Sequence, residues 1–142
     1  MNTLSLPFIE LQTSLYQRLS GSNELTSLVS GIYDYVTKDT PFPYIHIAEP
    51  TLSFEGVKAS NVQELKVTLH AWYNQMESEN YGNAEVYRML NAIYKSLKAP
   101  LDVPGWNVVR TKVSNPKVFD DINDILKHGV ITYSFTLQKT GE

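Results

Sequence analysis

The sequence predicts an α+β fold, in which helices pack on one face of a mainly antiparallel sheet of four to five strands. Strand-like stretches with a period of two follow one another without βαβ alternation, and helix-like stretches with a period near 3.6 stand apart from them. No internal repeat or low-complexity segment divides the 142 residues. We therefore expect one domain spanning residues 1–142, with an N-terminal helix pair and one central helix.

The N-terminal helix pair is predicted from an apolar stripe and the residues around it. The stripe of the first helix, over residues 4–19, consists of Leu4, Phe8, Leu11, Leu15 and Leu19. Pro7 fits only near the first turn of a helix, so Ser5 is the predicted cap. Gly21 is expected to end this helix, and residues 22–29 form a short second one.

The first strands are predicted before and after an irregular connection. A short edge strand covers residues 32–36, a second strand covers 44–49, and a long strand covers 62–73. The apolar face of the long strand consists of Leu65, Val67, Leu69 and Ala71. Polar side chains and Trp72 occupy its other face. Residues 51–60 are expected to form an exposed, mobile connection.

The central helix is predicted from a second apolar stripe. Its members are Val86, Leu90, Ile93, Tyr94 and Leu97. Asn83 is the expected N-cap, with a start as early as Ser78 as the alternative, and Pro100 prevents the helix from continuing.

The C-terminal part is predicted to hold two strands joined by a long acidic loop. The first strand covers residues 106–113, and its mixed faces leave its orientation open. A break follows at Asn115-Pro116. The acidic loop carries Asp120, Asp121 and Asp124. The last strand, residues 130–137, alternates cleanly and buries Ile131, Tyr133, Phe135 and Leu137.

Composition and motifs point away from catalysis. The net charge of −3 lacks the basic footprint that nucleic acid requires, and no apolar run reaches the length of a membrane span. There is no cysteine, no GxSxG, no phosphate-binding glycine loop and no calcium-loop pattern around the three aspartates. The first residues show no basic n-region and no apolar h-region of a signal peptide, so synthesis is expected in the cytoplasm. We predict no catalytic residue, no cofactor and no metal.

Three histidines and one tryptophan lie on or next to the predicted strands. His46, His70 and His128 lack the HxH or HExxH spacing of metal sites, which is typical of structural or surface histidines. An enzymatic or small-ligand-binding domain would require the three to meet in a concave pocket. Trp72 lies on the polar face of its strand, so it is expected at a subunit interface unless a helix covers that face.

Several stretches, in their order along the chain, carry a resemblance to a known family. They are the short helix at 24–29 running into GIYD at 31–34, PFPYIHI at 41–47, HAWY at 70–73 and HGVITYSF at 128–135. In this order they resemble the tail-completion, or head–tail joining (tail terminator), proteins of long-tailed phages and prophages. The resemblance spans almost the whole chain.

The resemblance implies a structural role with no catalytic residues. Such proteins assemble as a ring, commonly a hexamer, which caps the tail tube and joins it to the head connector. The implied partners are further copies of the chain, the tail tube protein and the head connector or stopper protein. The implied location is the virion, at the tail–head junction, after assembly in the host cytoplasm. Another neck or connector-completion protein is the alternative within the same class.

The resemblance also makes two loops the expected contact regions. They are residues 51–60 and 115–127. Together with Trp72, the expected interaction residues are Phe54, Glu55, Lys58, Asp120, Asp121, Asp124 and Lys127. The three aspartates, repeated around a ring, would form a negative collar that favours a basic partner.

Overall fold

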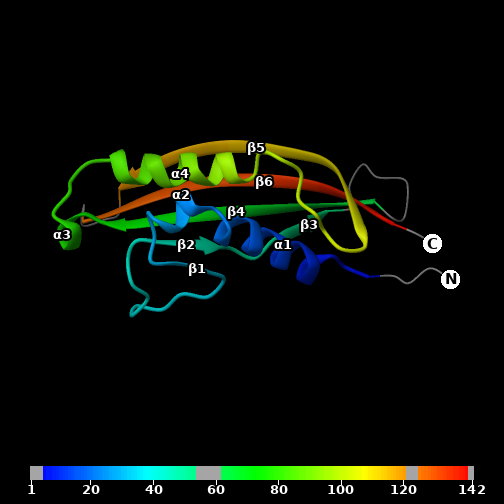
Figure 1. The fold of residues 1–142 in the computed structure, drawn as a ribbon, viewed down its shortest axis with the longest axis horizontal. Helices are drawn as coiled ribbons and strands as arrows, with labels where there is room; N and C mark the ends of the chain where they lie inside the picture. The colour runs from blue at the N-terminus through cyan, green and yellow to red at the C-terminus, as the bar shows by residue number, and fades with distance from the viewer. Residues whose placement is uncertain (1–4, 54–61, 121–124, 141–142) are drawn as a thin grey trace.

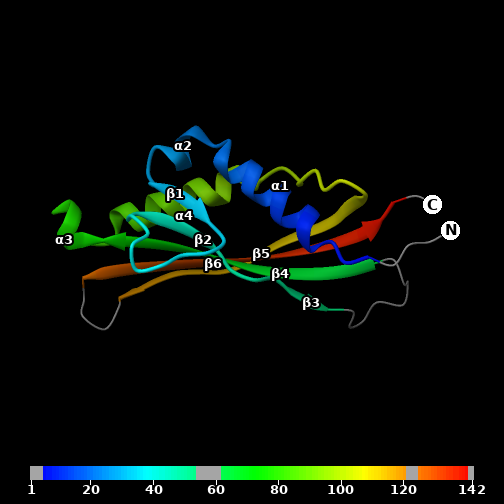
Figure 2. The same cartoon turned by 90° about the horizontal axis from the view of Figure 1, so that it is seen from below.

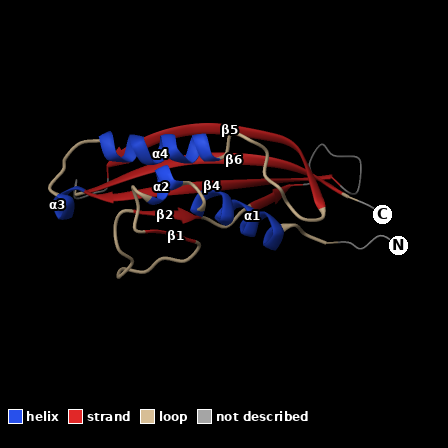
Figure 3. Cartoon of the chain, in the orientation of Figure 1, coloured by secondary structure: helices blue, strands red, loops and turns tan. Residues whose placement is uncertain are grey.

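The protein forms one long sheet with its helices gathered on a single face (Figures 1 and 2). The computed structural model describes residues 5–53, 62–120 and 125–140. Its helices are α1 (Phe8–Ser20), α2 (Asn23–Thr26), α3 (Gln75–Ser78) and α4 (Ala84–Ser96). Its strands are β1 (Gly31–Tyr33), β2 (Tyr44–Ile47), β3 (Thr51–Ser53), β4 (Val62–Asn74), β5 (Trp106–Asp120) and β6 (Leu126–Lys139), shown in red in Figure 3.

The sheet has the strand order β1-β2-β4-β6-β5, and β3 also pairs with β4. Only β1 and β2 run parallel, and every other pairing is antiparallel. The predicted α+β class, with a mainly antiparallel sheet and helices on one face, is confirmed. The three long strands have 13 to 15 residues, which gives the sheet a length of about 45 Å.

The sheet has six strands rather than four to five because residues 51–53 belong to it. Thr51, Leu52 and Ser53 pair with β4 on the same side as β2. The expectation of an exposed, mobile connection is therefore wrong for these three residues, whose backbone completes the edge of β4. The rest of that connection lies outside the described residues.

The N-terminal helices follow the prediction except at the N-cap of α1 and in the length of α2. α1 begins at Phe8, with Pro7 at the N-cap position and no side-chain capping bond, so Ser5 is not the cap. Gly21 ends α1 as predicted. α2 is shorter than predicted, and the Ser22 hydroxyl accepts a 3.2 Å hydrogen bond from the backbone of Leu25.

The central helix begins where the sequence predicts. α4 starts at Ala84, and Asn83 occupies the cap position without making a side-chain capping bond. Residues 75–78 form a separate turn of helix, α3, which the Asn74 side chain caps. The alternative start of the central helix near Ser78 is therefore wrong.

Two bulges explain why the faces of β5 looked mixed. One lies between Val108 and Arg110 and shifts the alternation, so Val108 faces the helices while Arg110 does not. The other lies between Ser114 and Lys117, at the position predicted to be a break. Pro116 is accommodated there because a bulge on an edge strand needs no ladder donor. β5 therefore continues to Asp120.

Helix α4 approaches the sheet closely at Gly129 of β6. A Cβ atom added there would lie 2.6 Å from Val86 Cγ1 and 3.2 Å from Leu90 Cδ1, both on α4. The missing side chain thus lets α4 rest on β6. At the other end of α4, Arg18 of α1 donates hydrogen bonds to three backbone carbonyls, those of Ser96, Ala99 and Pro100.

We predict that Gly129→Ala lowers the free energy of unfolding by about 1–3 kcal/mol, because the new methyl overpacks against Val86. Val86→Ala removes the obstructing group, so the double variant should lose less stability than the sum of the two single losses. Denaturant unfolding of the four proteins measures this coupling. Strictly additive losses would show that α4 does not rest on Gly129.

Candidate interaction surfaces

The face of the sheet opposite the helices carries a row of ring side chains, which we call the aromatic row: His46, His70, Trp72, His128 and Phe119. The strand register brings them together. His46 lies opposite His70, Trp72 lies opposite His128, and His128 lies opposite Phe119. The row therefore crosses four strands, and no described helix covers it (Figure 2).

The rings of the aromatic row are in direct contact. Trp72 stacks on His128 with a centroid distance of 3.8 Å and an interplanar angle of 9°, and Phe119 meets the same imidazole edge-on at 4.5 Å. His70 Nδ1 and His128 Nε2 are 2.7 Å apart, which is a hydrogen bond. One of these nitrogens must donate and the other accept, so at least one of the two imidazoles is neutral.

The neutral form is favoured at His70. Burial lowers the pKa of His70, and the nearby imidazole of His46 lowers it further. His70 thus resists protonation more than a free histidine does.

The three histidines do meet, on the sheet face opposite the helices, and none of them lines the three pockets described in this structure. Within the described ranges, no three potential ligand side chains are placed to hold a metal ion. The sequence placed each histidine on or beside a strand. It did not give the register that aligns them.

Trp72 points away from the helices, and its half-buried state comes from stacking on His128. Its proposed role at a subunit interface remains a prediction.

The expected acidic loop at 115–127 is wrong over most of its length. Residues 115–120 belong to β5 and residues 126–127 to β6. Asp120 and Lys127 lie opposite each other and form an ion pair, in which the Lys127 side chain is only 13% exposed. The other expected contact residues, Asp121, Asp124, Phe54, Glu55 and Lys58, lie outside the described residues. Their interaction roles remain predictions.

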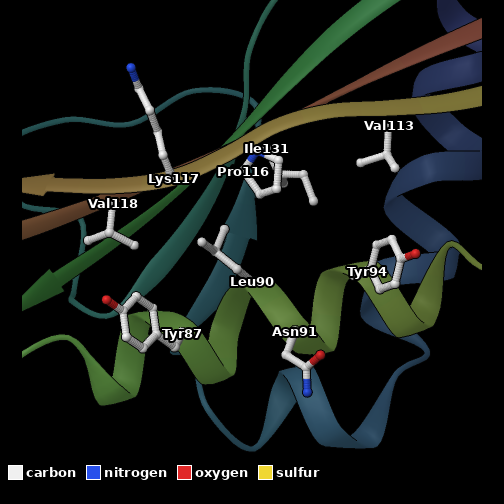
Figure 4. Close-up of a pocket in the computed structure, with 9 residues that line it drawn as sticks. All are labelled: Tyr87, Leu90, Asn91, Tyr94, Val113, Pro116, Lys117, Val118 and Ile131. Atoms are coloured by element: carbon white, nitrogen blue, oxygen red, sulfur yellow. The ribbon is translucent and has the colours of Figure 1, made fainter.

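A second surface, which we call the α4–β5 groove, lies on the helix side of the sheet. It encloses about 700 Å³. Figure 4 shows Tyr87, Leu90 and Tyr94 pointing from α4 towards β5, with Val113 and Val118 facing them. Pro116 also lines the groove, at the second bulge of β5. The lining is therefore mainly apolar, with tyrosine hydroxyls at its margin.

Sequence reasoning missed this groove. Tyr94 was expected in the buried stripe of the central helix, but it is 54% exposed, and Tyr87 is 56% exposed. Behind the groove, burial and then the neighbouring Tyr94 raise the pKa of Tyr133 to about 12. One sequence feature could have indicated this groove: Tyr87 and Tyr94 are seven residues apart, so they lie two turns apart on one side of α4.

Comparison with known proteins finds a matching family and a similar phage protein. A family model described as "Tail completion protein gp17" matches residues 13–138. The tail completion protein gp17 of Bacillus phage SPP1 is 27% identical over 128 residues, which are 89% of this chain and 91% of that protein. Among the described helices, none has the length and apolar character needed to cross a membrane.

Two solved structures share the fold. The structure of bacteriophage SPP1 gp17 aligns with a TM-score of 0.68 at 24% identity and covers 99% of each chain. A chain from the virion of a native gene transfer agent particle aligns with a TM-score of 0.74 at 16% identity, over 90% of this chain and 94% of that one.

We predict that the free energy of unfolding falls as the pH drops below about 6.5, the ordinary pKa of histidine. His70 binds a proton less readily in the folded than in the unfolded chain, so acid favours the unfolded chain down to the lowered pKa of His70. Denaturant unfolding between pH 7.5 and 5 measures the slope. His70→Gln should flatten it, and an unchanged slope in this variant would contradict the assignment.

Proposed function

The chain belongs to the tail completion protein gp17 family, and from this membership we propose that it closes the end of a phage tail tube as a ring of identical subunits. The family is structural and not enzymatic, so the chain is a structural protein of the virion, acting where tail and head meet. The finer proposal is that the ring, a hexamer, stops growth of the tube and presents a surface to the head connector.

The observation that carries this proposal is the extent of the family match. Residues 13–138 reach from the middle of α1 to the end of β6, so the whole fold is shared rather than one motif. The SPP1 relative covers nearly the same extent. A function that depends on the shape and surface of the entire subunit is consistent with such a match.

The subunit also has the physical features that a ring requires. A closed ring of identical chains needs two different surfaces that fit each other. Here the two edges of the sheet differ: β1 and β3 are short, whereas β5 is long and bulged. The aromatic row and the α4–β5 groove lie on opposite faces, which leaves separate surfaces for different partners.

The connection between β5 and β6 remains the proposed site for a basic partner. Asp121 and Asp124 belong to it by sequence, beside the ion pair of Asp120 and Lys127. Repeated around a ring, these carboxylates would produce a concentrated negative field. Such a field accelerates encounter with a positively charged surface of the head connector.

We predict that the purified chain binds the ends of tail tubes as a complete ring and prevents addition of further tube protein. Sedimentation of the chain alone, and electron microscopy of tubes with and without it, measure mass and tube length. A chain that stays monomeric and never binds tubes would refute the proposal. Binding to the head connector but not to tubes would favour the alternative neck protein.

We predict that Asp121→Asn with Asp124→Asn slows joining of tails to heads roughly 3- to 10-fold at low salt, because the steering field is weaker. The difference should shrink at high salt, where the field is screened. Asp120 is left unchanged because its loss would leave the largely buried Lys127 side chain without its ion-pair partner. Glu64→Gln with Asp102→Asn removes the same charge elsewhere and is the matched control. Equal rates for both variants at every salt concentration would exclude the acidic connection as a contact.

A further inference from the structure

The α4–β5 groove is an apolar surface at one edge of the molecule. Its size lies within the range of protein sites that enclose several apolar groups. Tyr87 and Tyr94 stand at its margin with more than half of each residue exposed. Figure 4 shows that the groove is open between these rings and the side chains of β5. A monomer that leaves such a surface in water commonly covers it in an assembly.

The backbone of β5 is poorly suited to pair with another strand. It has two bulges, it contains Pro116, and it presents Arg110, Lys112 and Lys117. Bulges, proline and cations on an edge strand are the features that prevent strand addition. A partner at this edge is therefore expected to insert side chains into the groove rather than to extend the sheet.

The opposite edge of the same molecule carries apolar side chains that are exposed to solvent. Leu6, Ile9 and Tyr16 are 54%, 78% and 47% exposed, and we call them the α1 stripe. Ile9 and Tyr16 are seven residues apart, so they lie two turns apart on one side of α1. Figure 1 shows α1 over the β2–β3 edge of the sheet and α4 over the β5–β6 edge. The stripe and the groove thus belong to different edges.

We propose that the α4–β5 groove of one subunit receives the α1 stripe of a second copy of this chain. The proposal rests on the ring function proposed above and specifies its subunit contact. The contact is heterologous, since a groove on one copy meets a stripe on the next. Repetition of such a contact produces a ring when the rotation closes.

The charges of the two edges support a second copy as the occupant. The edge strand β5 carries Arg110, Lys112 and Lys117 on the sheet face opposite the groove, and none of these three takes part in a salt bridge among the described residues. The segments at the other edge carry Asp34, Asp39 and Glu49, with Lys38 as the one cation among residues 34–49. Head-to-tail contact therefore brings a basic edge to an acidic one, which orients the approaching subunits.

Cysteine cross-linking tests this contact directly, because the chain contains no cysteine of its own. Two double variants are made, Ile9→Cys with Tyr87→Cys and Ile9→Cys with Tyr94→Cys, so that either direction of the helix along the groove is sampled. Met76→Cys with Tyr94→Cys is the control, because Met76 is 56% exposed but lies on α3. Each protein is treated with a short thiol cross-linker after assembly on tail tubes, and denaturing electrophoresis separates the products.

At least one Ile9 pair should give a ladder of cross-linked subunits that ends at the size of the ring, and the control pair should give none. In parallel, Ile9→Asp should raise the concentration needed for assembly at least about tenfold, while Met76→Asp leaves it unchanged. Circular dichroism checks that both aspartate variants keep their fold.

The result separates the contact from the function. Rings that form without a ladder from either Ile9 pair, and that tolerate Ile9→Asp, would overturn the proposed contact and leave the ring function standing. Absence of rings in the unmodified protein would overturn both.

Discussion

The pairing of β4 with β6 is the interaction on which the other parts of the structure depend. Every residue from Val62 to Asn74 has an antiparallel partner in β6. Because side chains alternate in both strands, this register places Leu65, Leu69 and their apolar partners on one face and polar or ring side chains on the other. A slip of one residue would exchange the two faces. The same pairing therefore fixes where helices can pack and which side chains remain for partners.

Two consecutive residues of β6 show how closely these outcomes are linked. Gly129 faces the helices, and its lack of a side chain lets α4 rest on the sheet. His128 points to the other face and stacks on Trp72. Because α4 packs over β6, it leaves the helix side of β5 uncovered. The space between α4 and β5 is the α4–β5 groove. One short segment thus shapes both candidate interaction surfaces.

The sequence was sufficient for properties that depend on local periodicity. It predicted the faces of β4, the buried residues Leu11, Leu15 and Leu19 of α1 and the class of fold, because a buried face must recur every two or 3.6 residues. Sequence-based prediction failed where the structure of a segment depends on pairing with residues far away in the chain. Residues 51–53 look irregular by themselves and become a strand only beside β4. Asn115-Pro116 signals a break, yet a bulge carries the strand through it. Likewise, no local pattern aligns His46, His70 and His128, since their meeting depends on the register of three strands.

The two edges of the sheet imply a particular kind of association. Strand addition is tolerant of register wherever backbone groups repeat, so rings built from bare strand edges would be weakly specified. The bulges, Pro116 and cations of β5 act against that mode. A groove that accepts particular side chains has one fitting position, and this fixes the rotation between neighbours. Ring closure depends on that rotation. Recognition through side chains, beside an edge strand that does not accept another strand, therefore suits a subunit that must form a closed ring with a fixed number of copies.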